Sequence, residues 1–268
     1  MAASNGSSSL AGKVAIVTGG ATSIGAAIVS ALHAAAASVV IADINEQAGA
    51  ALAQSRGPNA RFQPTNVTDD AAIAACVESA EAHFGGLDIL VNNAAVYIDN
   101  GIASERASWL EAINVNVVSG VRFVNAAAPA MKRRGGGAIV NMSSIAARFG
   151  QAGRAIYPAC KAAILQVTRN EAMELAPHHI RVNAVSPAWT WSAPIERATG
   201  GDRAKADRVG ADYHPLGRIG DAADVARAIV FLCSDDAAFI TGVNLPVDGG
   251  HAMTGPDQGK PATWRLSE

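Results

Sequence analysis

The stretch TGGATSIG, residues 18–25, has the composition of a loop that binds phosphate groups. It follows the apolar run VAIV and precedes the Ala-rich stretch AAIVSALHAAAA, which is the strand, turn and helix order of dinucleotide-binding loops. Glycines let backbone N–H groups approach a pyrophosphate, and the helix N-terminus adds roughly half a positive charge. The loop therefore predicts an anion site, although similar turns without a nucleotide are also common.

Asp43 lies 18 residues after Gly25, at the end of the apolar run SVVIAD. A carboxylate there can accept hydrogen bonds from an adenosine ribose. It would repel an added 2′-phosphate by about 1 kcal/mol per charge pair at ~4 Å in water and by ~4 kcal/mol at an effective dielectric near 20. No Lys or Arg occurs between Val14 and Arg56 to neutralise that phosphate. The sequence therefore favours NAD over NADP as the cofactor.

The elements that position these residues alternate between short β-branched runs and longer Ala-rich stretches. Near-continuous apolar strands separated by helices are typical of a parallel sheet covered on both faces. We therefore predict the α/β class, as a single doubly wound Rossmann-fold domain with a seven-stranded parallel sheet. The strands are expected in the runs KVAIVT, SVVIAD, RFQPTNV, LDILVN, GAIVNMS, IRVNAVS and VNLPVD.

No repeat, charge block or low-complexity linker divides the chain, so one domain is expected over residues 10–255. Residues 1–9 are rich in Ser, Gly and Asn and are expected to form a disordered tail, with a second tail over 256–268. The widest gap in the pattern is residues 187–213. A loop of that length is expected to cover the substrate.

The composition excludes several function classes. Half of the residues are hydrophobic and the formal net charge is −2, so there is no basic footprint for nucleic acid. No apolar run reaches the ~18 to 20 residues of a membrane span, and the N-terminus lacks a secretory signal. The three cysteines lie far apart and the histidines have no ligand spacing, so neither a disulfide framework nor a metal site is expected. A cytoplasmic protein with a small, nearly neutral ligand fits this composition.

Several motifs together resemble the short-chain dehydrogenase/reductase family over nearly the whole chain. They are TGGATSIG, NNAA at 92–95, the Ser of NMSS and YPACK at 157–161. A Tyr-x-x-x-Lys pair alone would be weak evidence for this family, since any helix can carry the pair by chance. In the family the catalytic Ser precedes the Tyr by 13 residues, which selects Ser144 over Ser143. Spacing around the family's catalytic Asn likewise selects Asn116 over Asn114.

The resemblance implies a catalytic set of Asn116, Ser144, Tyr157 and Lys161. Tyr157 and Lys161 are four residues apart and so share one helix face. The pKa of a free tyrosine is about 10, and the Lys161 ammonium with an oxidised nicotinamide is expected to favour the phenolate. Tyr157 would then remove the alcohol proton while Ser144 donates to the substrate oxygen. By family analogy, Lys161 also holds the nicotinamide ribose, and Asn116 positions a water.

The sequence departs from the family pattern at four positions. Ser23 replaces the second glycine of Thr-Gly-x-x-x-Gly-x-Gly, Ala95 and Ala188 stand where Gly is usual, and Asn66 replaces an acid. Ser23 costs little if its φ is negative and of order 1 kcal/mol if φ is positive, so cofactor binding is expected to be retained. The expected cofactor-binding residues are Gly19, Thr22, Ser23, Ile24, Gly25, Asp43, Asn66, Val67, Asn93, Ala94, Tyr157, Lys161, Pro187, Ala188 and Thr190.

Positions that line or border the substrate cleft in similar proteins carry several aromatic side chains, which favour an apolar or cyclic secondary alcohol or ketone. Packing of Trp189 and Trp191 onto the core or onto a neighbouring subunit is an equal alternative. A solvated Arg154 is favoured over a clamp on a substrate carboxylate or phosphate. The expected substrate-lining residues are Tyr97, Ala146, Phe149, Arg154, Trp189 and Trp191.

The leading hypothesis is an oxidoreductase that transfers a hydride between NAD(H) and a secondary alcohol or ketone. The family resemblance implies a homotetramer or homodimer. One alternative is an NADPH-linked reductase of 3-oxoacyl thioesters, which Asp43 disfavours. A second is a non-catalytic NAD-sensing protein, which would not need to retain the complete catalytic set.

Overall fold

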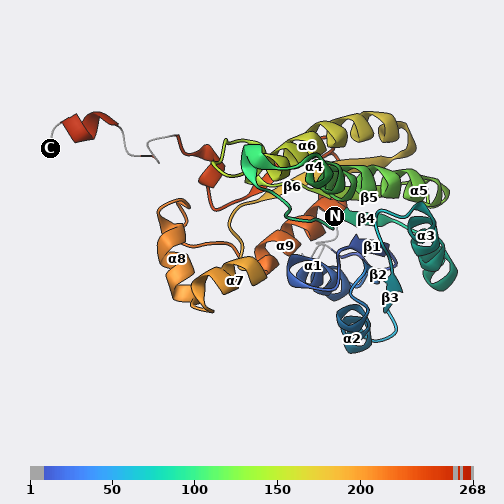
Figure 1. The fold of residues 1–268 in the computed structure, drawn as a ribbon. Coiled ribbons are helices and arrows are strands. Elements are labelled where there is room, and N and C mark those ends of the chain that lie inside the picture. Colours follow the sequence, from blue (N-terminus) through green and yellow to red (C-terminus); the bar gives the residue numbers. More distant parts are fainter. Residues whose placement is uncertain (1–8, 256–258, 260–261, 267–268) are drawn as a thin grey trace.

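The computed structural model describes residues 9–255, 259 and 262–266; residues 1–8 of the expected N-terminal tail and most of the expected C-terminal tail lie outside the described residues. Seven strands form one all-parallel sheet with helices on both faces (Figure 1). The predicted fold class is confirmed. The strands are β1 (Val14–Thr18), β2 (Ser38–Asp43), β3 (Ala60–Pro64), β4 (Ile89–Asn92), β5 (Gly137–Met142), β6 (Ile180–Pro187) and β7 (Asn244–Val247).

The strand order is β3-β2-β1-β4-β5-β6-β7, so the direction of winding reverses between β1 and β4. In register, Val14 of β1 lies beside Ser38 of β2, and Ala15 lies beside Ile89 of β4. Because all strands are parallel, their carboxyl ends meet at one edge of the sheet. Ligands of open α/β sheets bind at that edge, at the point of reversal.

Alternate residues of each strand bury themselves in opposite layers, as the pleat requires. Ala15 and Val17 of β1 pack into the layer beneath α1 and α9, whereas Val14 and Ile16 pack into the layer beneath α3 and α5. The helices of the first layer are α1 (Ser23–Ala34), α2 (Glu46–Arg56) and α9 (Ala222–Cys233). The second layer holds α3 (Asp70–Phe84), α4 (Arg106–Ile113), α5 (Ser119–Arg133) and α6 (Ile156–Leu175).

Residues 187–213, expected to be a loop, instead contain two short helices, α7 (Ala193–Thr199) and α8 (Arg203–Ala211). We call this segment the lid. The Pro and Gly residues that indicated a loop begin and end these helices: Pro194 lies in the first turn of α7, and Gly200 follows α7 in the left-handed conformation. Asp202 caps α8 by accepting a hydrogen bond from the N–H of Lys205.

Within these described ranges, no helix combines the length and the apolar character that crossing a bilayer requires. The described residues also contain no group of three or more His, Cys, Asp and Glu side chains placed to hold a metal ion. The cysteines, Cys76, Cys160 and Cys233, are buried and not disulfide-bonded.

Candidate active site

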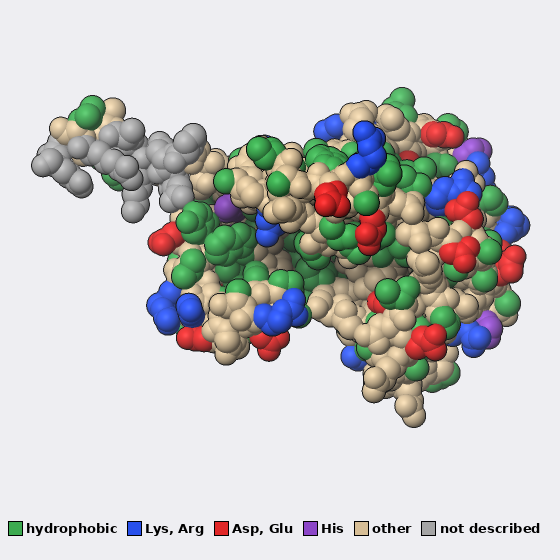
Figure 2. Space-filling view, in the orientation of Figure 1, with side chains coloured by type: hydrophobic (Ala, Val, Ile, Leu, Met, Phe, Trp, Pro, Cys, Tyr) green, Lys and Arg blue, Asp and Glu red, His purple; other side chains and the backbone are tan. Residues whose placement is uncertain are grey.

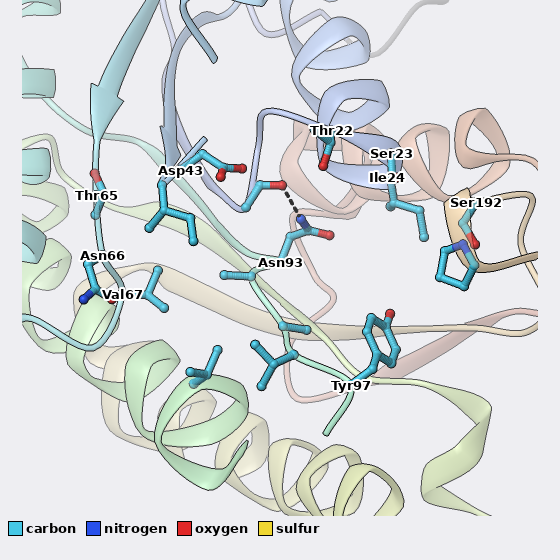
Figure 3. A pocket seen from close by; sticks show the side chains of 18 residues that line it. Thr22, Ser23, Ile24, Asp43, Thr65, Asn66, Val67, Asn93, Tyr97 and Ser192 are labelled. Carbon is cyan, nitrogen blue, oxygen red and sulfur yellow. Dashed lines mark hydrogen bonds between the residues drawn. The ribbon is translucent and has the colours of Figure 1, made fainter. Parts of the chain in front are cut away.

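The turn after β1 lies tightly against the loop after β4. The N–H groups of Asn93 and Ala94 donate to the Thr18 hydroxyl at 3.0 and 3.1 Å, and the Asn93 amide donates to the Gly19 carbonyl at 2.9 Å (Figure 3). A Cβ on Gly19 would lie 2.9 Å from the Ala94 Cα, and one on Gly25 would overlap the Gly19 carbonyl oxygen. These two glycines are therefore required by the close approach of the backbone.

The N-terminus of α1 is left open to an anion. Its N-cap residue, Thr22, makes no capping hydrogen bond, and the first turn carries no acidic residue. By contrast, α2 and α3 are capped by the side chains of Asn45 and Asp69, and α9 begins with a capping box. The first N–H groups of α1 therefore remain available to phosphate oxygens, and the helix dipole favours negative charge there.

Ser23 has a φ of +49°, in the left-handed region. Of the two possibilities left open by the sequence, this is the costly one, at about 1 kcal/mol. Its side chain is exposed and lines the cavity over the glycine turn. The strained residue thus places a hydroxyl at the opening of the anion site.

Asp43 joins the end of β2 to the glycine turn. One carboxylate oxygen accepts from the Ala21 N–H and the other from the Asn45 N–H, both at 2.9 Å. Each oxygen keeps a second lone pair, so the carboxylate can still accept from a ribose hydroxyl. Asp43 lines the cavity, and no described Lys or Arg is among the residues that line this cavity with it.

A cavity of about 380 Å³ covers the carboxyl ends of β1 to β4 (Figure 3). The expected cofactor residues that line it are Gly19, Thr22, Ser23, Ile24, Gly25, Asp43, Asn66, Val67, Asn93 and Ala94. Thr65 and Ser192 also line it but carried no signal in the sequence, because each contributes only through its place at the end of a strand or in the lid.

A second cavity, of about 920 Å³, lies between the lid and the body of the domain. Figure 2 shows it as a hollow around which hydrophobic side chains gather. It brings together the expected catalytic and cofactor residues Ser144, Tyr157, Lys161, Pro187, Ala188 and Thr190, and the expected substrate residues Tyr97, Ala146, Arg154 and Trp189. The expected catalytic residue Asn116 lines neither cavity.

Two expected substrate residues, Phe149 and Trp191, do not line this cavity. The Phe149 ring packs edge-on against His251, with ring centroids 5.7 Å apart. The Trp191 ring lies 5.5 Å from the Arg203 guanidinium in a cation–π contact that holds the lid together. The sequence predicted that both residues border the cleft. In the structure their rings instead contact His251 and Arg203.

Tyr157 is buried beside Ser144 and Tyr97. The rings of Tyr97 and Tyr157 are stacked, with centroids 4.9 Å apart. Burial raises the pKa of Tyr157 well above its usual value; Tyr97 adds to this rise, whereas a hydrogen bond with Ser144 and the charge of Arg154 oppose it. In the chain without a nicotinamide, burial is the largest influence on this pKa, and the expectation that Lys161 and an oxidised nicotinamide together favour the phenolate stays a prediction.

Lys161 is also buried, at 3% exposure, and its ammonium donates to the Met142 carbonyl at 2.8 Å. Burial lowers the pKa of Lys161 to about 8. The ammonium nitrogen lies 5.5 Å from the centre of the Tyr157 ring. The Lys161 ammonium therefore lies against the face of the Tyr157 ring. A change in charge nearby would readily alter the protonation of Lys161, because its pKa is about 8.

The two neighbouring serines have different partners. The buried Ser143 hydroxyl donates to the Lys161 carbonyl at 2.8 Å, which ties β5 to α6. The half-buried Ser144 faces the cavity and accepts from the Ala146 N–H at 3.2 Å. Both serines line the larger cavity, but the Ser143 hydroxyl is engaged with the Lys161 carbonyl, whereas Ser144 forms a hydrogen bond with Tyr157.

Asn116 lies in a π-helical turn, Asn114–Val118, between α4 and α5. Its side chain accepts from the Val96 N–H at 2.8 Å and donates to the Val96 carbonyl at 3.0 Å, whereas Asn114 is exposed. Such turns are often found at functional sites. Asn116 thus holds the loop after β4 against this helix, and its part in a proton path stays a prediction.

Asp99 is a positioning residue that the sequence pattern did not reveal. Its carboxylate accepts from the N–H groups of Ala155 and Tyr157, each at 2.9 Å, and so caps α6 from a loop 56 residues earlier in the chain. Burial opposes ionisation of Asp99, but these backbone donors outweigh it and hold its pKa below the ordinary value. No local motif could indicate a cap at such sequence separation.

Known proteins resemble this chain over most of its length. A family model described as enoyl-(acyl carrier protein) reductase matches residues 19–252. The chain is 38% identical to the 2,5-dichloro-2,5-cyclohexadiene-1,4-diol dehydrogenase of Sphingobium indicum, over 91% of this chain and 98% of that protein. It is 37% identical to the trans-4-hydroxycyclohexanecarboxylate dehydrogenase of Sinomonas cyclohexanicum, over 90% and 93%. It is 36% identical to the 3-oxoacyl-[acyl-carrier-protein] reductase of Escherichia coli, over 90% and 98%.

Replacing Ser23 by glycine should relieve the left-handed strain. We expect Ser23→Gly to raise the free energy of unfolding by up to about 1 kcal/mol, after the added entropy of the unfolded glycine is subtracted. The dissociation constant of NADH, measured by fluorescence titration, should stay within a few-fold. The matched control is Thr22→Gly, since Thr22 has a φ of −139° and no strain to relieve. Equal stability changes in the two variants would contradict the strain argument.

Replacing Asp99 by alanine should remove the cap of α6. We expect the free energy of unfolding in urea to fall by about 0.5–2 kcal/mol, and kcat to fall because the helix that bears Tyr157 loses its anchor. Since the folded pKa is lowered, the stability difference between wild type and variant should be full above the ordinary aspartate pKa and shrink as the pH falls through the lowered value.

The control for this variant is Asp69→Ala, which removes the cap of α3 away from the cavity. It should cost similar stability and leave kcat unchanged. Loss of kcat in both variants, or in neither, would show that Asp99 does not position the site.

Proposed function

Because the chain belongs to the short-chain dehydrogenase/reductase family of oxidoreductases, we propose that it transfers a hydride between NAD(H) and a secondary alcohol or the matching ketone. One observation carries the proposal: Ser144, Tyr157 and Lys161 line a cavity that adjoins an anion-binding glycine turn. The two cavities share the lining residues Ile24, Asn93, Ala95, Tyr97, Ser192 and Pro194.

The residues fit a dinucleotide at each of its parts. Asp43 would hold the adenosine ribose, the open N-terminus of α1 would hold the pyrophosphate, and Lys161 with Thr190 would hold the nicotinamide half. The glycines whose Cβ would clash leave the backbone bare where a pyrophosphate must approach. When bound, the nicotinamide supplies the hydride acceptor or donor.

NAD is proposed over NADP because of Asp43. The carboxylate is fixed by two backbone donors, so it cannot easily turn away from an added phosphate. A 2′-phosphate would bring about two negative charges, and the described residues that line this cavity offer no cation to offset them.

Tyr157 is proposed as the general acid and base. Its raised pKa keeps the hydroxyl protonated near neutral pH, so that it can donate a proton to a ketone oxygen. Ser144 would donate a second hydrogen bond to that oxygen as negative charge develops there. In the direction of alcohol oxidation Tyr157 must first lose its proton, and alkaline conditions favour that loss.

The substrate is proposed to be an apolar or cyclic alcohol. Ile145, Ala146, Trp189 and Val209 give much of the cavity an apolar wall. The names of two relatives refer to a cyclohexadiene diol and a hydroxycyclohexanecarboxylate, which are ring-bearing substrates. An apolar ring suits this apolar wall better than an extended polar chain does.

Reduction of a 3-oxoacyl thioester is a second candidate, favoured by the relative of that name at 36% identity. An NADPH-linked form of this reaction is disfavoured by Asp43. We further propose a cytoplasmic location and a homotetramer or homodimer, both as implied by the family.

Replacing Asp43 by alanine should narrow the cofactor preference. The ratio of kcat/KM with NAD to kcat/KM with NADP should fall at least about tenfold, because the charge repulsion is removed. Steady-state kinetics with both cofactors would measure it, and Glu46→Gln, an exposed acid outside the cavity, is the matched control. An unchanged ratio in Asp43→Ala would show that another group selects the cofactor.

Replacing Tyr157 by phenylalanine should lower kcat for NADH formation by about 10²- to 10⁴-fold, since it removes the proton acceptor. The assay is absorbance at the NADH band over a panel of acyclic, cyclic, polyol, hydroxy-acid and steroid alcohols.

In the wild type, kcat/KM for oxidation should rise with pH from neutral to alkaline conditions, because the pKa of Tyr157 is raised. Tyr213→Phe, outside the cavity lining, should retain activity. NADH binding without turnover of any alcohol or ketone would favour the sensing function instead.

A further inference from the structure

The charged residues that line the larger cavity all have the same sign. They are Arg154, Lys161, Arg197 and Lys205, and the described lining contains neither Asp nor Glu. The whole chain has a net charge of −2, so this concentration of positive charge is local. A cleft lined by one sign of charge between apolar walls focuses the electric field and attracts ligands of the opposite sign.

Three of these cations have exposed side chains and come from separate parts of the chain. Arg154 precedes α6, Arg197 lies on α7, and Lys205 lies on α8; all three side chains are exposed. In the described part of the chain, none of them forms a salt bridge. The sequence favoured a solvated Arg154; in the fold this side chain is exposed and also lines the cavity.

Three acidic residues of the lid, Glu196, Asp202 and Asp212, form none of the salt bridges among the described residues and do not line the cavity. Three others in or beside the lid are paired with arginines. Asp207 accepts from Arg203 at 3.0 Å, and Asp224 accepts from Arg218 at 2.9 Å. Asp221 is also bound by Arg203. These carboxylates therefore neutralise arginines outside the cavity lining and leave the lining cations free for a ligand.

Arg154 is close enough to the reaction centre for its charge to act on Tyr157. Both residues line the same cavity, so an anionic group bound by Arg154 would share that cavity with the carbon whose oxygen contacts Tyr157. The pyrophosphate of a dinucleotide is accounted for separately by the open N-terminus of α1, which lies on the other cavity. The free cations thus point to an anion on the substrate.

We propose that Arg154, with Arg197 and Lys205, binds a carboxylate on the substrate, so that the enzyme oxidises an apolar or cyclic hydroxy acid, or reduces the matching keto acid. The proposal rests on the proposed function, because it uses Tyr157 as the reacting group. It narrows the substrate class from alcohols in general to hydroxy acids. The cavity, of about 920 Å³, holds a ring with its carboxylate beside the nicotinamide half of the cofactor.

The first arm of the test compares turnover of matched substrates. Cyclic and acyclic hydroxy carboxylates are assayed with NAD beside the carboxamides of the same skeletons, which keep the shape and remove the charge. We expect kcat/KM to favour the carboxylate by about tenfold or more in the wild type, and the preference to weaken with added salt. Arg154→Gln should reduce the carboxylate-to-carboxamide ratio by about tenfold, and Arg197→Gln and Lys205→Gln by less.

The matched controls are Arg148→Gln and Arg208→Gln, exposed arginines near Arg154 and on α8 that do not line the cavity. Their ratios should equal that of the wild type. Measuring a ratio cancels any effect of Arg154 on Tyr157 itself, since both substrates react through the same hydroxyl.

The second arm measures binding without turnover. Cyclohexanecarboxylate and cyclohexanecarboxamide are titrated by calorimetry into the protein with NADH present. We expect the carboxylate to bind at least about tenfold more tightly, and Arg154→Gln to abolish the difference. A preference for the carboxylate in binding, with no turnover of any substrate, would support the anion site and sink the proposed dehydrogenase activity. Turnover of neutral alcohols with no carboxylate preference in either arm would overturn the carboxylate proposal and leave the dehydrogenase activity in place.

Discussion

The close approach of the turn after β1 to the loop after β4 is the constraint on which the site depends. Strands β1 and β4 are neighbours at the point where the sheet reverses its winding, so the segments that follow the two strands lie close together. Glycine at positions 19 and 25 removes the side chains that would collide, and Asn93 joins the two segments by hydrogen bonds. The result is a turn whose backbone carries no side chains at positions 19 and 25, next to the uncapped N-terminus of α1.

The same loop also sets the geometry of the proposed catalytic groups. After Asn93 it pairs with Asn116 through Val96, stacks Tyr97 on the Tyr157 ring, and caps α6 through Asp99. Seven consecutive residues, 93–99, therefore connect the cofactor turn, the π-helical turn and the helix that bears the tyrosine. A shift of this loop would move all three together, which gives the two cavities one common support.

Burial and charge act against each other in this cavity. Burial makes ionisation costly for both Tyr157 and Lys161, so their pKa values move away from the charged forms, upward for the phenol and downward for the ammonium. Hydrogen bonds from Ser144 to the phenol and from Lys161 to the Met142 carbonyl offset part of that cost. The side chains of Arg154, Arg197 and Lys205, which line the same cavity, are exposed, so buried and exposed basic groups face one cavity.

The sequence by itself determined the strand runs, the parallel sheet, the glycine turn and the acid after β2, because these depend on local periodicity and on short, fixed spacings. Family spacing distinguished Ser144 from Ser143, and their contacts now give the physical difference between them. The tertiary structure alone decided the φ of Ser23, the cap by Asp99, and which side chains of the lid turn toward the cavity. Each of these depends on groups that are far apart in the sequence and meet only in the folded chain. The pKa of Tyr157 is likewise decided by the tertiary structure, because the side chain is buried only once the sheet and helices have packed.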